Sequence, residues 1–390
     1  MGSRLTAAQG RKMPQLEIVE TPQPQLILQR ADGSRIALHP LWLRERCRSE
    51  ASMDKRTGQR VYNPSDLPAD LRITAVARPA AGRVTVTFSD GHVSQFEDSQ
   101  LLTEVAMAPD ADGLPAREAW TSTLKDLPEA IWSATPTPEA LFDMVTKFLR
   151  YGFVILHDVP RVSKSLFAVA ETFGFVRDTN FGRHFDVRSK PDANDLAYSS
   201  LFLDPHVDNP YREPSPGIQL LHCLINQTKG GLSTLVDGMA CAAALKERHP
   251  EAYRILSSTP VRFQFDDVDT QHIAWQPPLK LDEAGRFQAI HVSPRLDFVP
   301  LMSPTELDAF YAARRTLDGM LKAAEFEIRF RLGDGDLVMF DNRRLLHGRT
   351  SFDTREGERH LQGCYIDSDG PRSLYRMLDR QLQQQKRAAE

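Results

Sequence analysis

The sequence contains few cysteines and no long apolar run, and each shortage excludes a class of protein. Its four cysteines form no Cys-x-x-Cys pair, which favours reduced, buried thiols over a disulfide framework. They are Cys47, Cys223, Cys241 and Cys364. No apolar run approaches the roughly 20 residues that a membrane-spanning helix needs, and the N-terminus lacks an apolar signal core. We therefore expect no membrane segment and a cytoplasmic location.

An excess of charge of one sign is also missing. The 48 basic and 52 acidic side chains leave a formal net charge of −4, which gives no electrostatic reason to expect nucleic acid or an anionic membrane as partner. Apolar residues make up 41% and charged residues 26%, the balance of a globular protein with a substantial core. A chain of 390 residues suits two domains, or one domain with a large elaboration.

Short alternating runs near the N-terminus predict a small β-rich domain over residues 15–107. Residues 83–88 alternate between polar and apolar, the chain turns at Asp90-Gly91, and residues 93–96 resume the extended pattern, which indicates a hairpin. Residues 108–115 have the composition of a linker. We therefore expect a second domain over residues 116–386.

This second region mixes helices with short strands, which predicts an α+β, mainly β fold. Thr137-Pro138 and Ser303-Pro304 each place an N-cap residue before a proline, a sign of a helix start. Further helices are expected at 163–173, 241–248 and 376–390, and strands at 152–156, 337–340 and 359–365.

A histidine two residues before a carboxylate recurs in this region. In a strand, such a pair points the same way and can offer two ligands to one metal. Three pairs match, so the pattern alone is weak: His184 with Asp186, His206 with Asp208, and His249 with Glu251. His249 lies where a helix is expected to end, whereas His206 follows an extended run.

A third ligand is expected at His347, which follows the strand that ends at Phe340. Two histidines and one carboxylate leave three metal positions open, an arrangement that selects non-haem Fe(II) oxygen chemistry. Such a site also needs a cation for the distal carboxylate of 2-oxoglutarate, and Arg359 lies twelve residues past His347 on an expected strand. Arg349 and Arg355 are the nearby alternatives.

At these residues the chain resembles the γ-butyrobetaine hydroxylase-like group of the taurine-dioxygenase-like Fe(II)/2-oxoglutarate oxygenases. The resemblance extends over about residues 16–380, and its most specific motifs are residues 206–212, 216–223, 230–238 and 359–365. It implies a jelly-roll (double-stranded β-helix) catalytic domain with flanking helices, and iron on His206, Asp208 and His347. Arg359 would bind the 2-oxoglutarate carboxylate with help from Ser233 or Thr234.

The resemblance also implies an aromatic cage for a trimethylammonium group, which cation–π attraction favours. The matching positions are Phe181, Phe185, Tyr198 and Tyr365. Phe181 and Phe185 stand where the group typically has tyrosine and tryptophan.

The substrate-carboxylate positions of the group differ here. Asp195 replaces the first asparagine, and no asparagine occurs near residues 291–295, where a second is expected. An aspartate repels a carboxylate. These changes predict a substrate with an amine near Asp195, or with an acidic group such as a phosphonate near Arg295 or Arg183.

The N-terminal domain of this group often carries zinc on three cysteines and a histidine. Cys47 and His92 match two of those ligands, but Ser49 and Ser52 occupy the other two positions. Since serine does not replace a thiolate in structural zinc sites, we predict that zinc is absent. The domain is expected to be structural and to form a homodimer.

The predicted activity is hydroxylation of an unactivated C–H bond of a small amine or betaine-like substrate by O2 and 2-oxoglutarate, with release of succinate and CO2. One alternative is the same iron chemistry leading to desaturation or cyclisation of an amino acid or aminophosphonate. Another is a non-catalytic relative that binds a small ligand in the jelly-roll pocket.

Overall fold

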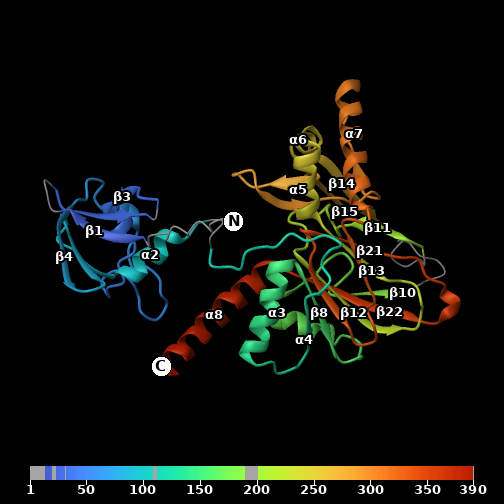
Figure 1. Ribbon diagram of the computed structural model, residues 1–390, viewed down its shortest axis with the longest axis horizontal. Helices are drawn as coiled ribbons and strands as arrows, with labels where there is room; N and C mark the ends of the chain where they lie inside the picture. Colours follow the sequence, from blue (N-terminus) through green and yellow to red (C-terminus); the bar gives the residue numbers. More distant parts are fainter. Residues whose placement is uncertain (1–13, 20–22, 31, 109–111, 189–200, 390) are drawn as a thin grey trace, which may run out of the picture. The chain divides into compact units, whose positions relative to one another are not determined.

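The computed structural model describes residues 14–19, 23–30, 32–108, 112–188 and 201–389 (Figure 1). The chain divides into two compact units, residues 1–113 and 114–390. All four cysteines are free and buried, so the prediction of reduced thiols is confirmed.

The N-terminal unit consists of two small antiparallel sheets and two helices. The first sheet contains β1 (Gln15–Val19), β2 (Gln25–Gln29) and β3 (Arg35–Ala37), and the second contains β4 (Ile73–Ala80), β5 (Arg83–Phe88) and β6 (Val93–Glu97). The helices are α1 (Pro40–Arg44) and α2 (Asp98–Ala106). The predicted hairpin is confirmed: β5 pairs with β6, and Val84 lies opposite Phe96 in the apolar core.

Two sheets form the centre of the second unit. The larger has seven strands: β7 (Glu129–Ile131), β8 (Phe153–His157), β9 (Val176–Arg177), β10 (Phe185–Arg188), β12 (Ile218–Asn226), β20 (Leu337–Asp341) and β22 (Arg359–Ile366). The smaller has the strand order β11 (Leu203–His206), β21 (Leu345–Arg349), β13 (Ser233–Asp237) and β19 (Glu327–Phe330). One apolar cluster combines Phe153 and Phe340 of the large sheet with Leu235 and Leu345 of the small one, so the sheets pack face to face. The predicted jelly roll and its α+β, mainly β class are confirmed.

Three helices cover the outer face of the seven-stranded sheet: α3 (Pro138–Tyr151), α4 (Leu166–Phe173) and α8 (Asp369–Ala389). The rings of Phe142 on α3 and Tyr375 on α8 stack with centroids 4.9 Å apart, and the two helices lie side by side in Figure 1. Thr137 Oγ1 accepts a hydrogen bond from the Ala140 amide, which confirms the predicted start of α3.

A second group of helices packs beside the small sheet. It contains α5 (Gly238–Arg248), α6 (Pro250–Ser258) and α7 (Pro304–Leu321), together with the strands β14 (Val261–Asp267), β15 (Thr270–Gln276), β16 (Leu279–Leu281), β17 (Phe287–Ile290) and β18 (Asp297–Phe298). Ser303 caps α7 as predicted, in a reciprocal capping box with Glu306.

In the second unit, three helix starts differ from those expected from the sequence, and one helix was missed. The helix expected from residue 163 begins at Leu166. The helix expected from Cys241 begins at Gly238, because the Asp237 side chain accepts a hydrogen bond from the Met239 amide and caps the helix there. The C-terminal helix begins at Asp369, not at residue 376. The missed helix is α6, whose first residue is a proline directly after His249.

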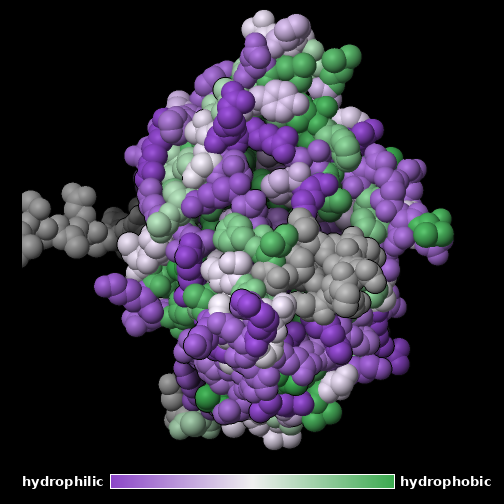
Figure 2. Space-filling model, turned by 90° about the vertical axis from the view of Figure 1, so that its right-hand side faces the viewer, coloured by the Kyte–Doolittle hydropathy of each residue, from purple (hydrophilic) through white to green (hydrophobic). Residues whose placement is uncertain are grey.

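The face of the molecule in Figure 2 is largely hydrophilic, with hydrophobic side chains in small groups. Within the described part of the chain, every helix is too short or too polar to cross a membrane.

Candidate active site

Two histidines face each other across neighbouring strands of the small sheet. His206 is the last residue of β11, and His347 is the central residue of β21. The antiparallel register places them directly opposite, and their ring centroids are 4.3 Å apart. Asp208 follows His206 by two residues, in the loop after β11.

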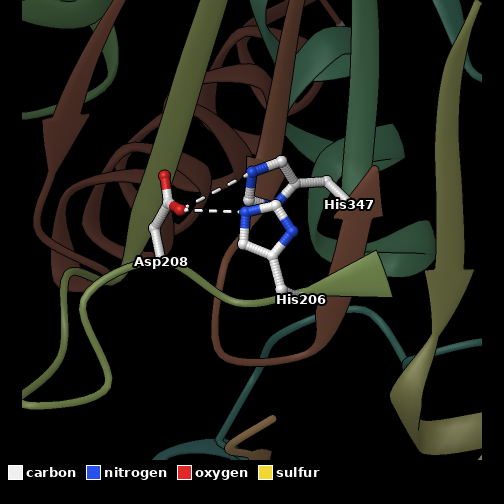
Figure 3. A group of neighbouring side chains, drawn as sticks. All are labelled: His206, Asp208 and His347. Atoms are coloured by element: carbon white, nitrogen blue, oxygen red, sulfur yellow. Dashed lines mark ion pairs between the residues drawn. The ribbon is translucent and has the colours of Figure 1, made fainter. Parts of the chain in front are cut away.

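Asp208 completes a compact group of potential metal ligands (Figure 3). Its Oδ1 lies 3.4 Å from His206 Nε2 and 3.8 Å from His347 Nε2. One ligand atom from each residue lies within 4.8 Å of the others, and the structure shows no second group of this kind among the residues that it describes. His206 Nδ1 lies 2.9 Å from the Asp204 carbonyl oxygen, which accepts the Nδ1 proton and leaves Nε2 free to bind a metal.

The protonation states also suit a divalent cation. Burial lowers the pKa of His347 to about 3, so its imidazole is neutral at physiological pH. Burial alone raises the pKa of Asp208, but the His347 and His206 rings and the Tyr365 hydroxyl leave that pKa well below its usual range. Two imidazoles and one carboxylate on one side of a metal form the donor set of non-haem Fe(II) oxygenases. The residues therefore fit iron.

The triad opens into a cavity of about 520 Å³. One part of its wall is aromatic: the ring centroids of Phe181 and Phe265 are 5.7 Å apart, and those of Phe185 and Tyr365 are 5.4 Å apart. Of the predicted cage, Phe181, Phe185 and Tyr365 line this cavity. Tyr198 lies outside the described residues.

Another part of the wall carries two buried arginines, Arg349 at the end of β21 and Arg359 at the start of β22. Both guanidinium groups lie against the Phe352 ring, 4.9 Å and 5.5 Å from its centroid. Burial lowers the pKa of each to about 10, so both stay charged at neutral pH. The third alternative, Arg355, is exposed and pairs with Asp353 at 2.6 Å, outside the cavity lining.

The double glycine of the family motif makes room for Arg359. Gly231 has a left-handed backbone with φ of +69°, and a Cβ atom there would lie 3.0 Å from Arg359 Nε. A larger residue would be strained and would displace the guanidinium. This close approach explains why the sequence needs a glycine beside the expected carboxylate-binding arginine.

The other predicted site residues divide into three groups. Ser233 and Arg295 line the cavity. Thr234 is buried on the other face of β13, opposite Gly348, and lies outside the lining. Arg183 pairs with Glu171 at 2.9 Å and also lies outside it, and Asp195 is not among the described residues.

The other two histidine–carboxylate pairs do not belong to the triad. Asp186 lies 2.6 Å from His360 Nε2 and accepts a hydrogen bond from Gln362, so it links β10 to β22. His249 lies at the junction between α5 and α6.

The sequence analysis missed several residues of the site. Tyr211, Gln219 and Phe265 line the cavity, and the buried Asn342 contacts the backbone of Asp208. Tyr211 follows the His206–Asp208 motif closely, a signal that could have been used, whereas Phe265 and Asn342 come from distant segments without a recognised motif.

The N-terminal unit contains the four positions considered for zinc, and they lie together. Cys47 Sγ is 3.2 Å from His92 Nε2 and 3.2 Å from Ser49 Oγ, and Ser49 donates to Ser52 Oγ at 3.3 Å. Arg44 also donates to Ser52 Oγ, at 3.0 Å. Hydrogen bonds therefore connect the cluster, and the absence of zinc stays a prediction.

Comparison with known proteins identifies the family. The model of the taurine catabolism dioxygenase TauD, TfdA family matches residues 127–365, and that of the gamma-butyrobetaine hydroxylase-like N-terminal domain matches residues 19–101. The chain belongs to the TauD/TfdA dioxygenase family. It is a 2-oxoglutarate-dependent dioxygenase whose cofactors are Fe(II) and 2-oxoglutarate. The predicted enzyme class and cofactors are confirmed.

Relatives match over nearly the whole length of this dioxygenase. It is 37% identical to the gamma-butyrobetaine dioxygenase of Pseudomonas sp. (strain AK-1), covering 90% of this chain and 92% of that protein. It is 31% identical to dioxygenase str8 of Strobilurus tenacellus (86% and 84%) and 27% identical to the mitochondrial trimethyllysine dioxygenase of Homo sapiens (87% and 82%). The crystal structure of AAD-2 in complex with Mn(II) and N-oxalylglycine shares the fold, with a TM-score of 0.50 and 18% identity over 65% of this chain and 98% of that one.

Proposed function

We propose that this dioxygenase hydroxylates an unactivated C–H bond of a small amine or betaine-like substrate and releases succinate and CO2. We assign iron to His206, Asp208 and His347, and the distal carboxylate of 2-oxoglutarate to Arg359. The observation that carries the proposal is a single cavity that contains the ligand triad, a buried guanidinium and an aromatic wall.

Iron bound at the triad would supply O2 activation coupled to the oxidative decarboxylation of 2-oxoglutarate. The three ligands come from one side of the site, so the cavity side stays open for 2-oxoglutarate and O2. The planar guanidinium of Arg359 matches a carboxylate in a bidentate manner. Leu221 and Leu361 line the same cavity and help to exclude water from the reacting C–H bond.

The aromatic wall supports a substrate with a cationic group. Aromatic ring faces attract ammonium groups, and quaternary ammonium groups are bound in this way in other proteins. The names of the relatives, gamma-butyrobetaine and trimethyllysine dioxygenase, agree with this chemistry. Arg295 lines the cavity too, which favours an acidic group elsewhere on the substrate.

The identity of that acidic group separates this proposal from the alternative of an amino acid or aminophosphonate substrate, and Asp195 is the residue predicted to influence that choice. Substrate orientation, in contrast, decides between hydroxylation and the alternative of desaturation or cyclisation. We expect Asp195→Asn to shift the preference toward carboxylate-bearing betaines, because it removes a negative charge that repels them. Turnover and substrate preference that both stay unchanged would contradict this role.

We further propose that the protein acts in the cytoplasm as a homodimer, with residues 15–107 as the dimer-forming domain and residues 116–386 as the catalytic domain. Light scattering of the full chain after gel filtration checks the oligomeric state. A mass of two chains is expected, and a mass of one chain would contradict the dimer.

The activity test uses protein reconstituted anaerobically with Fe(II) and 2-oxoglutarate and then exposed to O2. Succinate is followed with γ-butyrobetaine, related betaines, amines and aminophosphonates. We expect succinate to rise sharply with a betaine-like amine. No succinate with any compound, together with unchanged iron binding by His206→Ala, would show that the triad assignment is wrong.

A further inference from the structure

Asp208 differs from the other two ligands in how the fold supports it. His206 and His347 lie on paired strands, where the ladder between β11 and β21 fixes their backbones. Asp208 lies beyond the end of β11, in a loop, and 22% of its side chain is exposed. Contacts from elsewhere in the chain must therefore determine where its carboxylate points.

Asn342 binds the backbone of Asp208 on both sides. The Asp208 amide donates to Asn342 Oδ1 at 2.8 Å, and Asn342 Nδ2 donates to the Asp208 carbonyl at 2.9 Å. Asn342 Nδ2 also donates to the Pro216 carbonyl at 3.1 Å, so all its side-chain groups are used although the residue is 1% exposed. Because Asn342 lies in the turn between β20 and β21, five residues before His347, it connects two ligand-bearing segments.

Tyr365 binds the carboxylate itself. Its hydroxyl donates to Asp208 Oδ2 at 2.7 Å from the large sheet, where it lies on β22. The other oxygen, Oδ1, is the one that faces the imidazoles of His206 and His347 (Figure 3). The hydrogen bond thus selects which oxygen is offered to a metal, and the ring of the same tyrosine packs against Phe185 in the cavity wall.

We propose that Asn342 and Tyr365 are positioning residues that together fix Asp208 as a one-oxygen metal ligand, a pair that we name the Asp208 clamp. The inference rests on the proposed assignment of iron to the triad. Without the clamp, the loop backbone and the carboxylate rotamer are both free to turn, and ordering them on metal binding costs conformational entropy. Through Tyr365 the clamp also joins the aromatic wall to the metal centre.

The test measures binding of Co(II) alone, in the absence of 2-oxoglutarate and O2, by titrating its visible absorption in the full chain. Loss of hydrogen bonds to a metal ligand typically costs about 10-fold to 100-fold in affinity, so we expect Asn342→Ala and Tyr365→Phe each to weaken Co(II) binding by about 10-fold or more. Tyr365→Phe removes only the hydroxyl and keeps the ring, so it stays informative even if Asn342→Ala does not fold. The absorption band should also change shape, because the carboxylate geometry changes.

Two matched controls separate positioning from general stability. Asn226 is another buried asparagine whose Nδ2 donates to a distant carbonyl, that of Leu332 at 2.8 Å. Tyr62, in the N-terminal unit, is another tyrosine whose hydroxyl donates to a backbone carbonyl, that of Arg44 at 2.9 Å. Asn226→Ala and Tyr62→Phe should each lower the melting temperature and leave Co(II) affinity unchanged.

The Co(II) titrations test the Asp208 clamp separately from the assignment of iron to the triad. Wild-type affinity and band shape in both clamp variants, with binding abolished in His206→Ala, would overturn the clamp and leave the iron site standing. Wild-type affinity in His206→Ala would overturn both. Weakened binding in the clamp variants alone supports the clamp.

Discussion

Both units of the chain bring potential metal ligands together, but the two clusters differ in their donor atoms. In the catalytic unit, His206, Asp208 and His347 offer three ligand atoms, and burial keeps the His347 imidazole neutral. In the N-terminal unit, Cys47 and His92 meet two serine hydroxyls, and hydrogen bonds link Cys47 to His92 and Ser49. We therefore expect a metal at the first cluster and none at the second, because serine hydroxyls do not replace thiolates as zinc ligands.

The largest expected effect is at the catalytic cluster. His206→Ala removes one of the three proposed iron ligands, so iron binding and succinate formation should both be lost. Iron content after anaerobic dialysis checks the first, and succinate formation the second. As a control, His249→Ala changes a histidine between α5 and α6 and should keep both. Retained iron in His206→Ala would contradict the assignment of iron to the catalytic cluster.

The next effect concerns the basic wall of the same cavity. Arg359→Gln removes the charge but keeps some hydrogen bonding, and hydrogen bonds to charged groups contribute about 1.5–3 kcal/mol each. The KM for 2-oxoglutarate should therefore rise about 10-fold or more, with a smaller change in the KM for the amine substrate. Arg355→Gln, at an exposed arginine of the same region, should behave as the parent protein. Equal KM values in the two variants would show that another cation binds the cosubstrate.

Two substitutions would give the N-terminal cluster the donor atoms of a structural zinc site. Ser49→Cys together with Ser52→Cys would place three thiolates and His92 around one point, the donor set of structural zinc sites. We expect the double variant to copurify with one zinc ion and to lose thermal stability on treatment with a chelator. Because a chelator also removes metal from the catalytic triad, both proteins are compared after iron has been removed, and the melting temperature of the iron-free parent protein should not respond to the chelator. Zinc bound at this cluster in the parent protein would refute the predicted loss of the site.

The smallest effect is a pH dependence of the same cluster. Burial raises the pKa of Cys47, but hydrogen bonds with Ser49, Ser94 and His92 outweigh burial and lower that pKa to about 6, well below the usual range of a free thiol. A depressed folded-state pKa contributes stability that is complete above the unfolded pKa and is lost as the pH falls through the folded one. The stability advantage of the parent protein over Cys47→Ala should thus shrink as the pH falls from about 9 to about 6. A pH-independent difference in melting temperature would contradict a thiolate at this position.

Local patterns in the sequence predicted the parts of the fold and site that depend on neighbouring residues. The N-caps at Thr137 and Ser303 and the hairpin of residues 83–96 depend on contacts within a few residues or across one turn, and the structure has them as predicted. The extended run expected before His206, and the helix end expected at His249, distinguished these two histidine motifs from each other, whereas the pair at residues 184–186 was set aside by the family resemblance.

The rest depends on contacts between distant segments, which a single sequence does not reveal. Asn342 lies in a turn between two strands, a common place for an asparagine. Only the fold shows that its side-chain amide binds the backbone of Asp208, 134 residues away. Phe265 reaches the aromatic wall from β14 for the same reason. Arg349, considered only as an alternative to Arg359, lies in the same cavity, which the spacing along the sequence did not reveal.

The most direct test of the central claim supplies the reconstituted enzyme with O2 enriched in the heavy oxygen isotope, in ordinary water, with its best betaine-like amine. We expect one labelled oxygen atom in succinate and one in a hydroxylated product, formed in equal amounts. Labelled succinate with an unlabelled, desaturated or cyclised product would contradict hydroxylation, and unlabelled succinate or none would contradict the dioxygenase chemistry itself.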